Sequence, residues 1–330
     1  MTQERNTMQE LLIDKTNDIT KILLVENGNL IEKYEEEVGQ ERIEGYIYLG
    51  IVENILPGMQ AAFVNIGKDK NTFIHIRDVI PKVSEETGNK NEDFSKYNIN
   101  DYLKKDMPIL VQVKKDSTNK KGARISTHLS MPGRFVVIMP NEKFITISQK
   151  IDDLQERDRL KNILKKNLPQ NYGAIIRTSA IGKSEEEIVK DINKVINKYI
   201  EIEKEFNREK QKNGVVPELL YKSEDILERV ITDLMDQNLN RICTNDDEIY
   251  KLVNDKLKEE NQEIKVEKQE NILNMYDIQE QLKKINDRKI WLRCGGFITI
   301  DKTEALTAID VNSRKIHWQE RLGTYNFYSK

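Results

Sequence analysis

Short β-rich runs separated by glycine constrain the fold of this chain more than any other feature. Residues 45–67 read GYIYLGIVENILPGMQAAFVNIG, and further β-rich runs follow at residues 71–75 and 108–114. Glycines and a Pro-Gly pair allow the tight bends and bulges that a small closed barrel needs. Five such strands with loop insertions predict an OB-type barrel, and we expect the polar insertion at residues 81–105 to be mobile.

Aromatic and basic residues in this barrel make it a candidate for nucleic-acid binding. OB barrels bind single strands by stacking bases on aromatic rings beside basic side chains. Phe63 and Phe73 are the candidate stacking residues. A basic run follows, at Lys114, Lys115, Lys120, Lys121 and Arg124. The alternative is that both rings fill the barrel core and that the lysines belong to an ordinary solvated loop.

A second region of interest is the pair of apolar runs at residues 297–300 and 306–311. We expect two strands, each buried on at least one face and joined at a polar turn containing Asp301 and Lys302. Asp310 and Asn312 are two residues apart, so their side chains share a face while Val311 points into the sheet. A carboxylate with a neighbouring amide suits Mg²⁺. Alternatively, Asp-Val-Asn simply begins a turn.

A third candidate site lies at the end of a predicted strand, where Arg177 is followed by Thr178. The guanidinium offers a two-pronged donor to a phosphate, and the hydroxyl adds another donor. The dipeptide is too common to show a phosphate site by itself.

The other segments carry predictions of secondary structure. Residues 1–17 are polar and expected to fray, and residues 134–140 and 144–148 are expected to pair as strands. Periodic apolar residues predict helices, at residues 152–164, 185–212, 226–238 and 246–257.

Composition narrows the functional class only a little. The 330-residue chain has a formal net charge of −3, so a polyanion partner would have to bind a local patch. Two cysteines without a CxxC pair argue against a disulfide framework or a zinc site. We expect no membrane partner and a cytoplasmic location, because no long apolar run or leader-like segment occurs.

Three of these segments resemble the ribonuclease E/G family of bacterial endoribonucleases. The run GGFITIDKTEALTAIDVNS at residues 295–313 resembles the family's catalytic segment, and LPGMQAAFVNIG at residues 56–67 resembles its S1-type RNA-binding insert. The resemblance implies that Asp310 ligates Mg²⁺ with support from Asn312. It also implies that Phe63, Phe73 and Lys121 contact RNA. Arg177 and Thr178 match a pocket for the 5′-monophosphate of RNA.

The resemblance also implies an α+β multidomain architecture. An RNase H-like domain would be split, with its first part at residues 1–44 and its remainder at residues 222–290. The S1-type OB barrel would occupy residues 45–127 and a 5′-sensor region residues 128–221. Residues 291–330 would begin a truncated DNase I-like catalytic domain.

The implied activity is Mg²⁺-dependent endonucleolytic cleavage of single-stranded RNA, in the processing and decay of rRNA precursors and mRNA, with a preference for 5′-monophosphorylated ends. The alternative is a catalytically impaired RNA-binding remnant. The family forms homodimers and tetramers through a shared zinc site, whose cysteine pair we do not find in this chain.

The tail after Ser313 departs from the family pattern. The simple explanation is divergence. A second hypothesis is one extra base directly after the Ser313 codon, because a displaced reading with AT-rich codons restores Gly-Lys and Leu-Glu-x-Thr in register. The nucleotide sequence past this codon decides between them.

Overall fold

The computed structural model describes residues 8–37, 42–80, 96–117, 122–234, 239–259, 262–285, 287–292, 294–303 and 306–313. These residues form two compact units: the first lies within residues 1–16, 21–34 and 240–330, and the second within residues 17–20 and 35–239. The fold is mixed α/β, with several separate sheets. Of the described helices, none is both long and apolar enough to cross a membrane.

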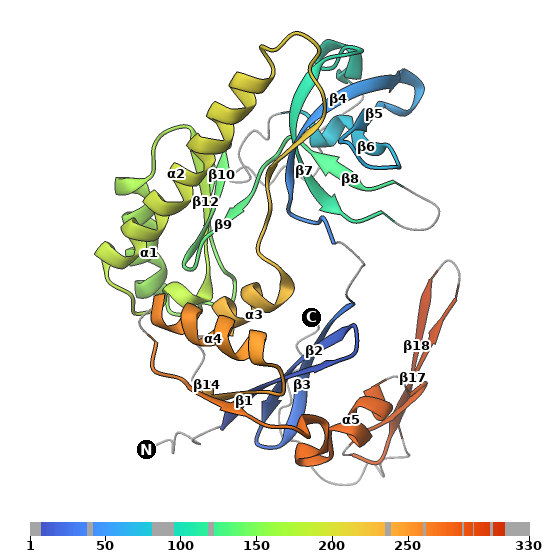
Figure 1. The fold of residues 1–330 in the computed structure, drawn as a ribbon, viewed down its shortest axis with the longest axis vertical. Helices are drawn as coiled ribbons and strands as arrows, with labels where there is room; N and C mark the ends of the chain where they lie inside the picture. Colours follow the sequence, from blue (N-terminus) through green and yellow to red (C-terminus); the bar gives the residue numbers. More distant parts are fainter. Residues whose placement is uncertain are drawn as a thin grey trace, which may run out of the picture. The chain divides into compact units, whose positions relative to one another are not determined.

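The second unit contains the predicted barrel. Its strands are β4 (Ile47–Leu56), β5 (Ala61–Asn65), β6 (Thr72–His75), β7 (Pro108–Lys115) and β8 (Arg124–Ser126). The strand order β4-β5-β6-β8-β7 closes through a β4–β7 pairing, which confirms a five-stranded OB-like barrel (Figure 1). Small or β-branched residues of alternate positions fill it, such as Ala62, Val64 and Ile74, all fully buried. β13 (Glu218–Tyr221) extends the sheet beside β4.

The insertion after β6 is only partly as expected. Residues 81–95 lie outside the described part of the chain. Its later part is neither wholly polar nor detached, because Ile99 and Leu103 are buried in the barrel core. Ile99 begins a 3₁₀ turn (Ile99–Asp101). The Gln60 Oε1 accepts a hydrogen bond from the Ile99 amide at 2.8 Å and so ties this turn to the barrel.

A four-stranded sheet adjoins the barrel within the second unit. Its strands are β9 (Met131–Pro132), β10 (Val136–Pro140), β11 (Ile145–Ile147) and β12 (Tyr172–Ile176), in the order β11-β12-β10-β9. The expectation that residues 134–140 pair with residues 144–148 is wrong. β10 pairs with β12, and β11 pairs in parallel with the other edge of β12. The crossover between β11 and β12 is α1 (Leu154–Asn167), which is long enough to allow the parallel pairing.

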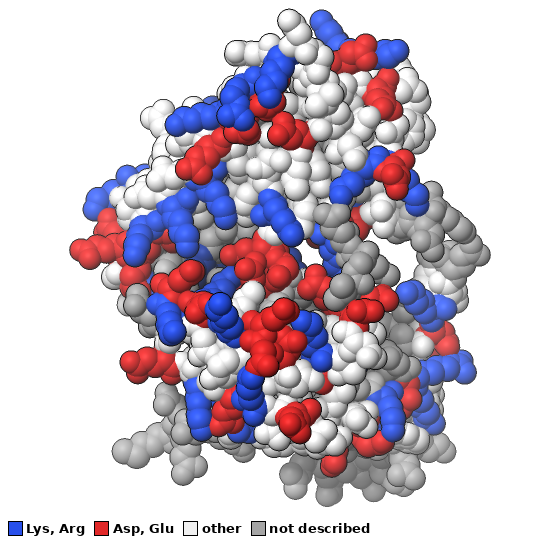
Figure 2. Space-filling model, viewed as in Figure 1, with Lys and Arg blue, Asp and Glu red and all other residues white. Residues whose placement is uncertain are grey.

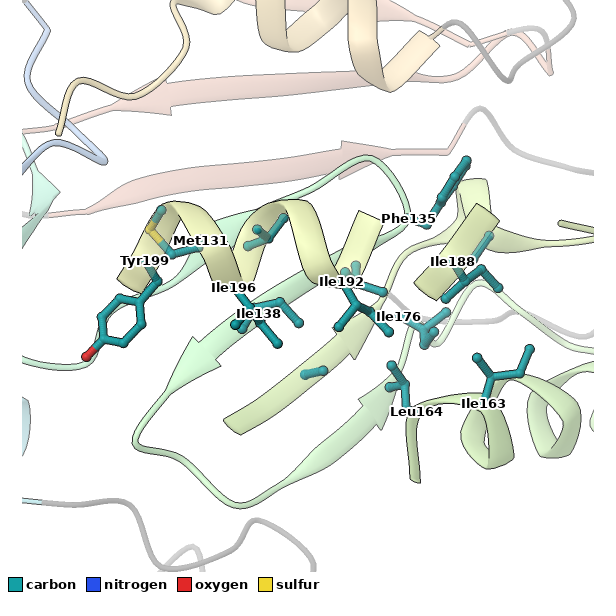
Figure 3. Close-up of a cluster of buried hydrophobic side chains, with 14 of the residues drawn as sticks. Met131, Phe135, Ile138, Ile163, Leu164, Ile176, Ile188, Ile192, Ile196 and Tyr199 are labelled. Carbon is teal, nitrogen blue, oxygen red and sulfur yellow. The ribbon is translucent and has the colours of Figure 1, made fainter. Parts of the chain in front are cut away.

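Helix α2 (Glu185–Glu209) covers this sheet and supplies much of its core. A capping box of Ser184 and Glu187 starts the helix by satisfying its first amides. Its apolar stripe points at the sheet, as Figure 3 shows for Ile188, Ile192 and Ile196. Val195, Tyr199 and Ile202 belong to the same buried cluster. The stripe therefore packs on its own domain. α3 (Ile226–Leu234) follows β13, and its predicted continuation to residue 238 lies outside the described residues.

The first unit is built on a five-stranded sheet in the order β15-β14-β1-β2-β3. Its strands are β1 (Gln9–Thr16), β2 (Ile19–Glu26), β3 (Asn29–Glu37), β14 (Leu239–Thr244) and β15 (Lys265–Lys268). The expectation that residues 1–17 fray is wrong for β1, where Leu11, Leu12 and Ile13 are fully buried. β1 lies between β14 and β2, so both of its edges are paired. α4 (Asp247–Glu259) and α5 (Ile278–Ile285) complete the helices of this unit.

A separate three-stranded antiparallel sheet follows, formed by β16 (Lys289–Trp291), β17 (Phe297–Lys302) and β18 (Thr307–Asn312). Asp301 and Lys302 belong to β17 rather than to the turn, and Asp301 bonds to the Arg288 guanidinium. The burial expected of β18 is not observed: Ile309 is 63% exposed and Val311 62% exposed. Residues 314–330, the tail discussed above, lie outside the described residues.

Candidate functional site

Phe63 and Phe73 lie directly opposite each other on neighbouring strands of the barrel. They are register partners of β5 and β6, and their rings meet edge to face with centroids 6.3 Å apart and an interplanar angle of 69°. Their sequence neighbours Ala62 and Ile74 point into the core, so alternation places both rings on the outer surface. Both rings remain partly exposed. The two rings therefore do not fill the barrel core, which was the alternative.

Arg124 lies beside this aromatic pair and is held in place. It is the register partner of Phe73 in the parallel β6–β8 pair. Its Nη2 donates to both carboxylate oxygens of Asp78, at 2.9 and 3.1 Å, while the Arg124 side chain stays 50% exposed. The guanidinium is thus fixed at the surface beside a partly exposed ring. Lys121, which was expected to join this site, lies outside the described residues, as does Lys120.

His75 belongs to the same outer face and was missed by sequence reasoning. It follows Phe73 by two residues, and its Nδ1 accepts a hydrogen bond from the Arg77 amide at 3.2 Å. Partial burial lowers the pKa of His75, and the nearby Arg77 charge lowers it further. The ring is therefore neutral at pH 7 and adds a third flat, uncharged surface. The only sequence signal was the Phe-x-His spacing.

Arg177 lines a cleft of about 330 Å³ in the second unit. We call this the Arg177 cleft. It is lined by Glu44, Gly45, Gln112, Val113, Lys114, Ser130, Pro132, Gly133, Val137, Arg177, Ser223, Glu224, Arg229, Thr232 and Asp233. The Arg177 guanidinium does not stand open as the sequence suggested. Its Nη1 donates to the Gly133 carbonyl at 2.9 Å, and its Nη2 donates to the Asp233 carboxylate. Thr178 is the first residue of a 3₁₀ turn (Thr178–Ala180).

Asp191 on α2 fixes the loop that carries Gly133. Its carboxylate accepts hydrogen bonds from the amides of Arg134, Phe135 and Val136, at 3.1, 2.8 and 3.2 Å. The approach is so close that a Cβ on Gly133 would lie 2.6 Å from the Asp191 Oδ2. Burial raises the pKa of Asp191, and the three amide hydrogen bonds oppose this increase. The wall of the Arg177 cleft therefore depends on a buried carboxylate.

Replacing Asp191 with alanine is expected to destabilise the second unit by about 3 kcal/mol, because three amides lose a buried acceptor. Thermal unfolding followed by circular dichroism measures the effect. Lys190→Ala is the matched control, since Lys190 is the exposed neighbour on the same helix. Equal melting temperatures for the two variants would contradict this role of Asp191.

Asp310 and Asn312 lie together on one face of β18, as the spacing predicts. The Asn312 Nδ2 donates to the Asp310 Oδ2 at 2.6 Å. Asp310 pairs across the sheet with Thr299, and Asn312 pairs with Phe297. Val311 does not point into a buried sheet face. Among the described residues, the structure brings no group of three or more His, Cys, Asp or Glu into metal-binding proximity.

Three carboxylates of the five-stranded sheet, those of Glu10, Asp14 and Glu267, make structural contacts. Glu10 is buried and bonds to Arg241, whose Nη1 also donates to Glu267 at 2.9 Å. Asp14 accepts from the Asn245 Nδ2 and the Thr16 hydroxyl, each at 3.0 Å. These contacts join neighbouring strands and loops of the sheet. Across the face drawn in Figure 2, basic and acidic side chains are interspersed.

Comparison with known proteins places the chain in a family. Residues 130–326 match the Ribonuclease E/G family, a span that includes Arg177 and Asp310. The chain belongs to this family. Ribonuclease G of Salmonella typhimurium is 33% identical over 312 residues, covering 92% of this chain and 62% of the relative. Ribonuclease E of Nostoc sp. is 32% identical over 309 residues, covering 89% of this chain and 43% of the relative.

Ribonuclease G of Haemophilus influenzae is 31% identical over 318 residues and shows the same coverage, 92% of this chain and 62% of the relative. The chain therefore spans about three-fifths of the length of the ribonuclease G relatives that it matches. The resemblance noted in the sequence is confirmed at the level of the family.

Proposed function

We propose that this chain binds single-stranded RNA on the outer face of its barrel and cleaves the bound RNA as a Mg²⁺-dependent endoribonuclease. The observation that carries the proposal is the partly exposed Phe63–Phe73 pair, beside the fixed guanidinium of Arg124. Rings on which bases stack, next to a positive charge that meets the backbone, are the usual equipment for binding single strands. Lys121 would extend this basic border.

The finer architecture is part of the same proposal. The five-stranded sheet with α4 and α5 would be an RNase H-like domain, formed by residues 1–44 and 222–290. The barrel, at residues 45–127, would be its S1-type insert, and residues 128–221 would form the 5′-sensor region. Residues 291–330 would open a DNase I-like catalytic domain. The supporting feature is the sheet order β15-β14-β1-β2-β3, which pairs strands that precede the barrel with strands that follow the four-stranded sheet.

The Arg177 cleft would receive the 5′-monophosphate end of the RNA. Arg177 enters the cleft from the end of β12, and Gly133 and Val137 line it from the neighbouring loop and strand. The guanidinium already binds one carbonyl and one carboxylate, and a phosphate would take the place of the carboxylate. Thr178 follows Arg177 directly but is not among the residues that line the cleft, so its hydroxyl would contribute only from beside it. Holding one end of the RNA raises its effective concentration at the site of cleavage.

Asp310 would provide a carboxylate ligand for Mg²⁺. The donor set fits this role in part: the carboxylate is exposed on a strand, and the Asn312 amide donates to its Oδ2 at 2.6 Å, which orients it. Mg²⁺ bound there would supply charge stabilisation at the scissile phosphate of the RNA and a more acidic water. Asn312 would keep the carboxylate turned toward that face of β18.

A second candidate function is RNA binding with little or no cleavage. The exposure of Ile309 and Val311 favours it, because a carboxylate on a sheet without a packed face is held less rigidly. Incubation of the full chain with 5′-monophosphorylated single-stranded RNA and Mg²⁺ separates the two. RNA fragments that form with Mg²⁺ and do not form when EDTA is added support the endoribonuclease. Tight binding of the RNA without fragments supports the second function. For either function, the RNA partners that we propose are rRNA precursors and mRNA. A homodimer or tetramer like those of the family is also part of the proposal.

A further inference from the structure

The Arg177 cleft carries as many acidic as basic side chains. The basic ones are Lys114, Arg177 and Arg229, and the acidic ones are Glu44, Glu224 and Asp233. A site that only attracts a phosphate would not need acids on its wall, because each one repels the ligand. The placement of these acids is therefore informative about selectivity.

Asp233 is the acid that bonds to Arg177 itself. Its Oδ1 accepts from the Arg177 Nη2, while the Arg177 Nη1 donates to the Gly133 carbonyl at 2.9 Å. The Arg177 side chain is 25% exposed and the Asp233 side chain 36% exposed, so a ligand from solvent can reach this pair. Both prongs of the guanidinium are thus committed to protein oxygens at the position where a phosphate would bind.

The two partners of Arg177 differ in how firmly they are held. Gly133 sits in the loop that Asp191 fixes through hydrogen bonds to three backbone amides. Asp233 reaches the cleft from α3, and its side chain is more exposed than that of Arg177, at 36% against 25%. A competing anion would therefore displace Asp233 rather than the Gly133 carbonyl. A phosphate monoester carries up to two charges and three acceptor oxygens, more than one carboxylate offers.

We propose that Asp233 is a positioning residue that competes with the 5′-phosphate of RNA for the Arg177 guanidinium, and so sets the threshold for recognising that end. A terminal phosphate takes the place of the Asp233 carboxylate, whereas a 5′-hydroxyl end has no charge with which to displace it. The inference rests on the proposed function of the cleft. It predicts that removing the Asp233 charge increases discrimination between the two kinds of end.

Equilibrium binding of the full chain to two RNAs tests the inference. Both are the same single-stranded oligoribonucleotide with a 3′ fluorophore, one carrying a 5′-monophosphate and the other a 5′-hydroxyl. Fluorescence anisotropy gives both Kd values. The readout is the Kd of the hydroxyl RNA divided by the Kd of the monophosphate RNA, which increases with discrimination. Asp233→Asn is expected to tighten binding of the monophosphate RNA by about twofold to fivefold, the size typical of a partly exposed ion pair, and to leave binding of the hydroxyl RNA unchanged.

Glu224→Gln is the matched control, because it removes the same charge from the same cleft without touching the Arg177 contact. It is expected to change both Kd values by the same factor. An Asp233→Asn ratio equal to or below that of the unmodified protein would overturn the inference. The same holds if Asp233→Asn and Asp233→Ser both lose the cooperative thermal transition, since Asp233 would then be a structural anchor.

Arg177→Ala separates failure of the inference from failure of the proposed function. If the unmodified protein prefers the monophosphate RNA and Arg177→Ala abolishes that preference, the proposed role of the cleft stands and Asp233→Asn alone decides the inference. If the unmodified protein and Arg177→Ala bind both RNAs equally, the proposed role fails and the inference fails with it. In the double variant Arg177→Ala/Asp233→Asn, the gain expected from Asp233→Asn disappears.

Discussion

Replacing Asp310 with alanine is expected to reduce cleavage of single-stranded RNA by about a thousandfold or more, because the proposed metal loses its carboxylate ligand. Binding of the same RNA should stay within about twofold, since Asp310 belongs to the three-stranded sheet of the first unit and the barrel to the second. Single-turnover cleavage with Mg²⁺, measured beside equilibrium binding, gives both quantities from one preparation.

Asp301→Ala is the matched control for this prediction. Asp301 is a carboxylate on the neighbouring strand β17, and it bonds to Arg288 instead of facing a partner amide as Asp310 does. It should keep cleavage close to that of the unmodified protein. Full cleavage by Asp310→Ala would contradict the prediction, because it would show that Asp310 is not a required metal ligand. Asn312→Ala is expected to have a smaller effect, because Asn312 only orients the carboxylate.

The double replacement of Phe63 and Phe73 with alanine is expected to weaken binding of single-stranded RNA by about 30-fold or more, since each stacked ring contributes about 1–3 kcal/mol per base. The dependence of binding on salt should be unchanged, because neither ring carries a charge. Arg124→Ala should instead reduce the slope of that salt dependence. Fluorescence anisotropy over a range of salt concentrations measures both effects.

Met59→Ala serves as the control for the aromatic pair. Met59 is 61% exposed and belongs to the 3₁₀ turn (Pro57–Met59) just before β5, so it changes exposed apolar surface without changing a stacking ring. Its RNA affinity should match that of the unmodified protein. If the double phenylalanine variant binds as Met59→Ala does, the rings do not hold the RNA.

The parts of the fold that depend on local pattern were predictable from the sequence. The barrel follows from short β runs divided by glycine. The sequence left open which way Phe63 and Phe73 point, and the structure answers it, because both alternate with the buried residues Ala62 and Ile74. The capping box at Ser184 and the apolar stripe behind it predict α2 in the same local way.

The parts that depend on distant contacts were not predictable. β1 looks polar because only its centre is apolar, yet β14, more than two hundred residues later, pairs with it. Strand pairing around β12 was misjudged because α1 permits a parallel neighbour on the far edge. The Arg177–Asp233 contact joins residues 56 positions apart, and nothing near either one in the sequence signals the pairing.

The central claim, that RNA lies on the outer face of the barrel, is tested most directly by photo-cross-linking. Single-stranded RNA containing 4-thiouridine is irradiated with the full chain, and the cross-linked peptides are identified by mass spectrometry. Cross-links should concentrate on the β5 and β6 peptides that carry Phe63 and Phe73, and an excess of unlabelled single-stranded RNA should remove them. Cross-links that avoid both strands while the RNA is bound would contradict the account.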